Sequence, residues 1–168
     1  AQHLSPAGSL LVWNPGCGNG YETYSLAAVL REEYPESSIK IWAHDSDLLA
    51  ISTAPNLVFK SGEIPEGLRG YTAEAKNGMF FEKSIRDIIL FEYHDVLHEN
   101  PFPEVDLIVA RDLVSFQKQE GQDAFLRECA DKLKPGGVLV LGSNERAFSD
   151  EFEETAVESV RAYRKKQR

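Results

Sequence analysis

Positive charge is scarce in this chain. Its 18 lysines and arginines stand against 27 aspartates and glutamates, which gives a formal net charge of −9. A surface that follows nucleic-acid phosphates or an anionic membrane needs an excess of basic residues, so neither partner is expected. Long apolar stretches are missing too. No stretch approaches the ~18 residues that cross a bilayer, so direct membrane insertion is not expected either.

Cysteine and histidine are also sparse. The two cysteines, Cys17 and Cys129, lie far apart in the sequence and form no metal-ligand spacing. The same holds for His44, His94 and His98, which are better explained as packed or surface residues. No metal site is therefore expected, and the low cysteine content is typical of a reduced, cytoplasmic setting.

Methionine occurs once, at Met79, and the chain begins with neither a methionine nor a signal peptide. We therefore expect a fragment of a longer protein. The 168 residues suit one domain, spanning residues 1–168. A domain of this size buries ~70 % of its unfolded surface, enough for a real core.

Strand and helix signals alternate along the chain. Apolar runs predict strands at 10–13, 38–44, 88–93, 105–110 and 138–141, and apolar spacing predicts helices at 22–34, 48–53 and 119–133. This alternation is typical of an α/β fold with a mostly parallel, twisted sheet and helices on both faces. Residues 55–85 are irregular and rich in Gly, Pro and charge, which predicts an insertion. The composition of 151–164 favours a helix, although its apolar residues also suit a hairpin.

The first predicted strand ends in a glycine-rich loop. Gly16, Gly18 and Gly20 alternate with other residues, and the first helix follows directly. This spacing differs from the dinucleotide fingerprint G-x-G-x-x-G and from the NTPase phosphate loop, which needs Gly-Lys-Ser/Thr. It is nearer to the G-x-G-x-G loop of S-adenosylmethionine (SAM) methyltransferases, where main-chain N–H groups face the ligand. A plain glycine-rich turn has the same sequence.

Aspartates follow two of the predicted strands. Asp45 ends the second strand and Asp95 the third, and open α/β sheets bind ligands at the carboxyl ends of their strands. Asp45 can accept hydrogen bonds from both hydroxyls of a ribose, and Asp95 from an adenine amino group. Taken alone, each is better explained as a turn or cap residue. Together with the glycine loop and the later Lys-Pro-Gly-Gly sequence, they indicate a SAM site.

Short motifs spread over residues 9–165 carry a resemblance to one family. They are residues 16–25, Asp45-Ser46-Asp47, Leu68-Arg69-Gly70-Tyr71-Thr72, residues 89–97, residues 110–117, Leu133-Lys134-Pro135-Gly136-Gly137 and Gly142-Ser143-Asn144-Glu145. In this order they resemble the SAM-binding domain of the chemotaxis receptor methyltransferases (CheR). The resemblance implies a Rossmann-like class I SAM methyltransferase fold, a small β insertion at about 55–85, and strands near the C-terminus.

The resemblance also implies a set of cofactor contacts. In a cofactor site that is vestigial at most, these contacts are Gly16, Gly18, Gly20, Glu22, Asp45, Asp95, Val96 and Arg111.

At the family's working positions the chain departs from the pattern. The acid that follows the last loop glycine in the family, and faces the cofactor's ammonium group, is here Tyr21. A tyrosine that lines the family's methyl-transfer pocket corresponds to Phe116, which has no hydroxyl. The family's N-terminal helical domain, which supplies an arginine for the cofactor carboxylate, is expected to be absent from this chain.

These departures predict a non-catalytic, CheR-like structural or docking element of chemotaxis signalling. No cofactor is expected, or only weak binding of SAM or S-adenosylhomocysteine (SAH). The expected partners are other chemotaxis proteins (a receptor, coupling protein or kinase), and the expected location is the cytoplasm, including the membrane-associated receptor array. Two other hypotheses stay open: an active SAM-dependent protein-glutamate O-methyltransferase of chemoreceptors, and a SAM/SAH-sensing module.

Two segments are candidate docking elements. Phe80 and Phe81 in the insertion could accompany strand addition of a partner, with residues 85–89 pairing with 79–83; alternatively they seal the core beneath the insertion. The basic run at 161–168 is expected either as a solvated terminus or as a docking tail.

Overall fold

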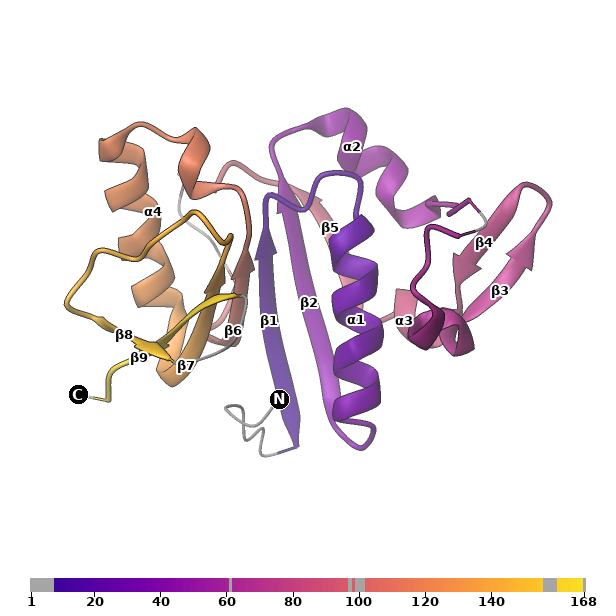
Figure 1. Ribbon diagram of the computed structural model, residues 1–168, viewed down its shortest axis with the longest axis horizontal. Coiled ribbons are helices and arrows are strands. Elements are labelled where there is room, and N and C mark those ends of the chain that lie inside the picture. The colour runs from indigo at the N-terminus through magenta and orange to yellow at the C-terminus, as the bar shows by residue number, and fades with distance from the viewer. Residues whose placement is uncertain (1–7, 61, 97, 99–101, 156–159, 168) are drawn as a thin grey trace.

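Seven strands form the central sheet of the molecule (Figure 1). This computed structural model describes residues 8–60, 62–96, 98, 102–155 and 160–167. The strand order is β5-β2-β1-β6-β7-β9-β8; the first five of these run parallel, and β9 and β8 form an antiparallel hairpin at one side. The strands are β1 (Ser9–Pro15), β2 (Ser38–Asp45), β5 (Ile89–Tyr93), β6 (Val105–Ala110), β7 (Leu133–Leu141), β8 (Phe152–Thr155) and β9 (Arg161–Lys165).

Helices cover both faces of this sheet. Side chains of a strand point alternately to its two faces. Leu10 and Val12 of β1 accordingly pack in one core cluster with the buried side of α1, and Trp13 packs in a second cluster with that of α4. The helices are α1 (Tyr21–Glu33), α2 (Leu48–Thr53), α3 (Lys83–Arg86) and α4 (Gln119–Lys132), with 3₁₀ turns η1 (Ala54–Asn56), η2 (Glu66–Tyr71) and η3 (Val114–Phe116). The predicted α/β class and the two-faced helix cover are confirmed.

The segment between α2 and β5 forms a second, small sheet beside α1, at the right of Figure 1. Strands β3 (Thr72–Ala75) and β4 (Gly78–Phe81) pair antiparallel, and Phe59 exchanges two backbone hydrogen bonds with Met79 at 2.7 and 2.8 Å. The expected pairing of residues 85–89 with 79–83 is wrong. Both neighbours of β4 are already taken, by β3 and Phe59, and Ile85 lies in α3.

The C-terminal region consists of strands, as the resemblance implied and the composition did not. Phe152 of β8 and Tyr163 of β9 pack in the same core cluster as α4, which offsets the helical preference of this acidic and basic stretch. Most of the basic run is therefore neither a solvated terminus nor a tail. Residues 161–165 form β9, where Arg161 pairs with Glu154 and the Lys165 ammonium donates to the Leu133 carbonyl at 2.6 Å.

In the described part of the chain, no helix combines the length and the hydrophobicity that a membrane span requires.

Candidate functional site

The glycine loop folds back onto the end of β2. The N–H groups of Gly16 and Cys17 both donate to the His44 carbonyl, at 2.8 and 3.1 Å, and Gly20 N–H closes the turn on the Cys17 carbonyl. Gly20 has φ +87°, and a Cβ there would lie 2.9 Å from the Phe91 ring. Only glycine fits this position, since both the backbone angle and the close ring exclude a side chain.

Asp45 lies directly against the glycine loop. One carboxylate oxygen accepts from the Gly18 N–H at 2.7 Å, and the other accepts from the Asp47 N–H at 2.8 Å. Asp47 in turn caps α2 by accepting from Leu49 and Ala50. Both oxygens that were expected to receive ribose hydroxyls therefore already hold the loop and the next helix in place.

The ends of β2 and β5 are adjacent, as a shared nucleoside site requires. The His94 N–H donates to the Asp45 carbonyl at 3.0 Å, which brings Asp95 next to the loop. The Asp95 carboxylate lies 3.3 Å from His98 Nδ1 and stays about half exposed. The side chain of Val96 instead packs in the core cluster of α4.

Glu22, in the first turn of α1, and Arg111, directly after β6, form an ion pair. Arg111 Nη1 lies 2.9 Å from Glu22 Oε2, and Asn14 Nδ2 donates to the other Glu22 oxygen at 3.2 Å. Asn14 is fully buried; its amide also donates to the Val109 carbonyl and accepts from the Thr23 hydroxyl at 2.6 Å. The first turn of α1 is thereby tied to both β1 and β6.

The two departures from the family pattern take up different surroundings. The Tyr21 side chain is 44 % exposed, and its ring stands edge-on to Phe59 of the insertion with centroids 5.0 Å apart. Phe116, in η3 after β6, is 83 % exposed. Tyr21 supplies a phenol but no carboxylate beside the loop, and Phe116 supplies no hydroxyl.

Glu145 is a site residue that sequence reasoning did not identify. Its buried carboxylate accepts three backbone hydrogen bonds, from Asp112 at 2.9 Å, Ser115 at 2.8 Å and Gly142 at 2.8 Å. It fastens the loop that carries Arg111 to the loop after β7. The signal was the Gly-Ser-Asn-Glu motif itself, in which the glutamate is the one acidic residue.

Cys17, between two loop glycines, is a packing residue. It contacts a cluster with Ala43 and Ile51. Burial, and then the Asp45 carboxylate, raise the pKa of its thiol to about 12. A thiol protonated at neutral pH is a poor nucleophile.

The expected docking pair is divided between core and surface. Phe81 is 1 % exposed, stacks on Tyr24 and belongs to the core cluster of α1, so its assignment to a docking surface is wrong. Adjacent strand residues point to opposite faces. Phe80 accordingly lies half-buried, with the Arg86 guanidinium 5.6 Å from its ring.

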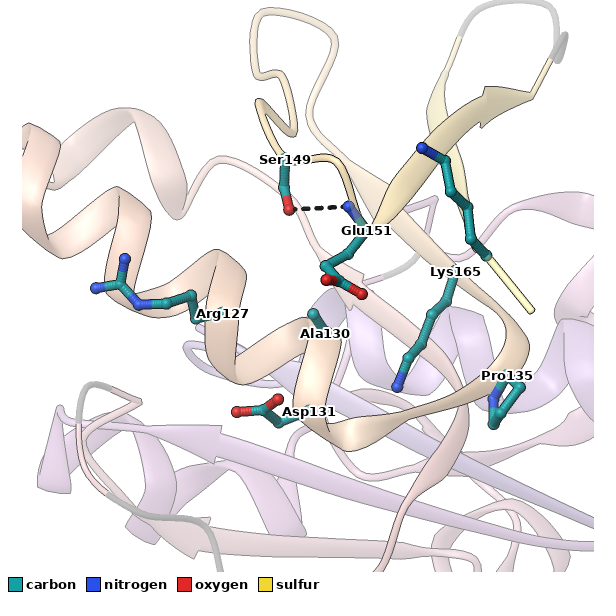
Figure 2. Close-up of a pocket in the computed structure, with 8 residues that line it drawn as sticks. Arg127, Ala130, Asp131, Pro135, Ser149, Glu151 and Lys165 are labelled. Atoms are coloured by element: carbon teal, nitrogen blue, oxygen red, sulfur yellow. Dashed lines mark hydrogen bonds between the residues drawn. The ribbon is translucent and has the colours of Figure 1, made fainter. Parts of the chain in front are cut away.

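A pocket of about 470 Å³ lies between α4 and the β8–β9 hairpin (Figure 2). Arg127 and Asp131 of α4 and Glu151 before β8 give it mixed charge, and Lys165 and Lys166 both donate to backbone carbonyls. The last turn of α4 leads to the start of β7, at the sheet edge opposite the glycine loop. This pocket is therefore separate from the candidate cofactor site.

A Gly-x-Gly-x-Gly loop, Asp45 and the β5 end meet at one sheet edge, which is the arrangement of a SAM-binding fold. Residues 1–163 match the family described as CheR methyltransferase, SAM binding domain. The chain belongs to this CheR family.

Relatives with similar sequences agree with this membership. Cher3 of Pseudomonas putida is 31 % identical over 174 residues, covering 94 % of this chain and 63 % of that protein. A chemotaxis protein methyltransferase of Listeria innocua is 29 % identical over 150 residues. The match covers 84 % of this chain and 56 % of the Listeria protein. This chain therefore spans less than two thirds of the length of either relative.

Among solved structures, PKMT2 of Rickettsia typhi, determined in complex with AdoHcy, has a TM-score of 0.54 to this chain. It is 18 % identical, and the match covers 82 % of this chain and 22 % of that one. At this identity the likeness establishes the class I SAM methyltransferase fold, which the family resemblance had implied.

Proposed function

We propose that this CheR domain is a non-catalytic docking element of bacterial chemotaxis signalling that binds SAM or SAH weakly or not at all. Its partners are other chemotaxis proteins in the cytoplasm, such as a receptor, a coupling protein or a kinase. The observation that carries the proposal is Tyr21. It stands where the family resemblance implies a carboxylate for the cofactor's ammonium group, and its ring packs on Phe59 instead.

The neighbouring Glu22 supports this proposal because its carboxylate is already paired with Arg111. A charge-assisted hydrogen bond contributes ~1.5–3 kcal/mol, so loss of the ammonium contact alone weakens binding by roughly 10- to 100-fold. Phe116, which is exposed and lacks a hydroxyl, leaves the family's methyl-transfer pocket without its tyrosine.

One observation favours a second candidate, a SAM-binding enzyme or sensor. Glu22 and Arg111 are opposite charges 2.9 Å apart beside the loop, and the amino-acid end of SAM carries the same two charges. If the ion pair opened, Glu22 could bind the ammonium group of the cofactor and Arg111 its carboxylate. The missing carboxylate at Tyr21 would then have little effect on binding.

Calorimetry of the chain with SAM and SAH distinguishes these candidates. We expect dissociation constants no tighter than ~100 μM for either ligand, and tighter binding by ~10-fold or more in Tyr21→Glu, because the new carboxylate meets the ammonium group. Tyr21→Gln is the matched control. Its side chain has nearly the same size as that in Tyr21→Glu but no charge, so the affinity for SAM should not increase. Low-micromolar binding by the unaltered chain, lost in Arg111→Ala, contradicts the proposal and favours the sensor or enzyme.

Catalysis is tested separately with radiolabelled SAM and receptor-containing membranes. We expect no methyl transfer to receptor glutamates, even when a family N-terminal domain is supplied, because Tyr21 and Phe116 remove two working positions. Label above background that disappears in Asp45→Ala would show that the domain is an active methyltransferase.

A further inference from the structure

The outer edge of β5 is a feature that the candidate cofactor site does not use. β5 is the last strand on its side of the sheet, and among the described strands it pairs with β2 alone. The elements in extensive contact with β5 are β2 and α2, and α2 lies over the face that carries Ile89 and Phe91. Neither element covers the edge that points away from β2. Accordingly, Leu90, Glu92 and Tyr93 are exposed, which is three of the five residues of the strand.

The backbone groups along this edge have no partner strand. The Ile41 N–H donates to the Ile88 carbonyl at 2.8 Å and the His94 N–H to the Asp45 carbonyl at 3.0 Å, so the even-numbered residues face β2. Backbone groups alternate in direction along a strand, so those of residues 89, 91 and 93 point outward. Beyond the ladder with β2, no backbone hydrogen bond in the described ranges involves these three residues.

β5 also lacks the features that usually protect an edge strand. Natural edges are blunted by proline, lysine, a bulge or a covering element. The sequence of β5, Ile-Leu-Phe-Glu-Tyr, contains neither proline nor lysine, and its register with β2 has no bulge. Such an edge is suited to strand addition, in which backbone hydrogen bonds hold an extended partner segment.

The charge at this edge indicates which kind of segment fits. Residues 87–110 contain no lysine or arginine, and the side chains of Glu92 and Asp95 are both about half exposed. The ion-pair partner found for Glu92 in the described part of the chain is His44, whose Nδ1 accepts from the Trp13 indole N–H at 3.2 Å. That acceptor role requires a neutral ring, so the charge of Glu92 is not compensated. In a chain of net charge −9, this edge disfavours a second copy and favours a segment with positive charge.

Two lysines near this surface limit how much positive charge it accepts. Lys40 lies 4.7 Å from the centre of the Trp42 ring, and the Lys132 ammonium donates to the Phe102 carbonyl at 3.2 Å. Glu92 is in register with His44, four residues beyond Lys40 along β2, or ~13 Å of strand. The surface therefore fits one positive side chain beside Glu92 better than a uniformly basic segment.

We propose that β5 receives an extended segment of a partner protein as an eighth strand of the sheet. The backbone of this segment bonds to residues 89, 91 and 93, and one lysine or arginine lies beside Glu92. Its alternate residues are apolar, because they continue the face of Ile89, Phe91 and Tyr93. The proposal does not depend on whether the glycine loop binds SAM, and it would stand if the domain were an active enzyme.

The test measures amide hydrogen exchange in the full chain by NMR. The probe is the peptide acetyl-Thr-Val-Lys-Val-Thr amide, which has one lysine between two valines. In the chain alone we expect fast exchange at residues 89, 91 and 93, and slower exchange at Leu90 and Glu92, whose N–H groups bond to β2. With a dissociation constant of roughly 1 mM or tighter, 5 mM peptide should slow exchange at residues 91 and 93 at least ~5-fold.

Two control peptides separate backbone pairing from charge. N-methyl groups on both valine amides remove the N–H groups that face β5 and keep every side chain, so this peptide should give no protection. Replacing the lysine by glutamate keeps the backbone and should weaken binding ~5-fold, because the new charge meets Glu92.

Variants of the chain locate the binding. Tyr93→Pro removes one outward N–H at a position where an edge strand tolerates proline, and should weaken binding ~10-fold relative to Tyr93→Ala, which keeps that N–H. Glu92→Gln should weaken it ~3-fold, and Glu32→Gln, exposed on α1, should leave it unchanged. Circular dichroism checks the fold of each variant.

Several results would overturn the proposal. These are protection by the N-methylated peptide, preference for the glutamate peptide, and equal affinity in folded Tyr93→Pro and Tyr93→Ala chains. Protection of residues 89, 91 and 93 in the chain alone, together with a dimeric mass by light scattering, would show that a second copy occupies the edge. The peptide comparisons use the unaltered chain, so they decide the question even if Tyr93→Pro fails to fold.

Discussion

At the scale of single residues, Asn14 holds the candidate site together. It is fully buried at the end of β1, and its one amide group reaches β6 through the Val109 carbonyl and α1 through Thr23 and Glu22. Asn19, five residues later, lies between two loop glycines and is exposed. The buried partners of Asn14 lie up to 95 positions away.

Replacing Asn14 should therefore be costly. We expect Asn14→Ala to lower the free energy of unfolding by about 2–4 kcal/mol, because the Val109 carbonyl and the Thr23 hydroxyl both lose a buried partner. Asn19→Ala, the matched control, should change it by less than about 0.5 kcal/mol. Urea unfolding of the three proteins measures both; similar losses in the two variants would show that the hydrogen bonds of Asn14 are not the cause.

At the scale of elements, the insertion is attached to the body by one face of β4. Phe81 lies parallel to the Tyr24 ring of α1 with centroids 5.4 Å apart, and edge-on to Phe59 at 5.3 Å. Phe80, one residue earlier, lies on the other face and is half-buried. The strand period of two thus gives one phenylalanine to the core and leaves the other at the surface.

The two phenylalanines should respond very differently to truncation. Phe81→Ala should cost about 3–5 kcal/mol in free energy of unfolding, the range found for buried aromatic side chains. Phe80→Ala should cost about 1 kcal/mol, because it loses partial burial and its contact with Arg86. Thermal and urea unfolding of the two variants and the unaltered chain measure both losses of stability. If a docking role exists in this strand, loss of partner binding without loss of stability should appear in Phe80→Ala and not in Phe81→Ala.

At the scale of the whole molecule, several acidic groups are buried in their protonated form. Burial, then Asp45, raise the pKa of Cys17 from 9.0 to about 12, and burial raises that of Tyr24 from 10.0 to about 12. Burial, then Glu128, also raise the pKa of Cys129. The unfolded chain releases these protons at lower pH than the folded chain, so rising pH favours unfolding.

These groups should therefore make their full contribution to the free energy of unfolding below about pH 9. That contribution should fall progressively between pH 9 and 12. Each group contributes a slope of up to ~1.4 kcal/mol per pH unit within its own interval. Urea unfolding at half-unit steps from pH 8 to 10.5 measures the slope. The double variant Cys17→Ala/Cys129→Ala should have a shallower slope than the unaltered chain, and an identical slope would mean that other groups control alkaline unfolding.

The sequence by itself determined the order and type of most elements. The predicted ranges 48–53 and 105–110 coincide with α2 and β6, and the helix predicted from residue 22 ends just before Pro35, as α1 does. These features follow from the spacing of apolar residues and from glycine and proline. Each of these signals influences the backbone conformation of only a few neighbouring residues. The resemblance added the C-terminal strands, which composition had left ambiguous.

Only the tertiary structure decided how the site residues are engaged. The pairing of Glu22 with Arg111 joins residues 89 positions apart, and the bond between Gly18 and Asp45 spans 27. The placement of Phe81 in the core and the three bonds of Glu145 are decided in the same way. Side-chain partners depend on which strands become neighbours and in which register, and no local pattern contains that information. The sequence therefore determined which groups this protein has, and the packing of its sheet decided which of them remain available to a ligand.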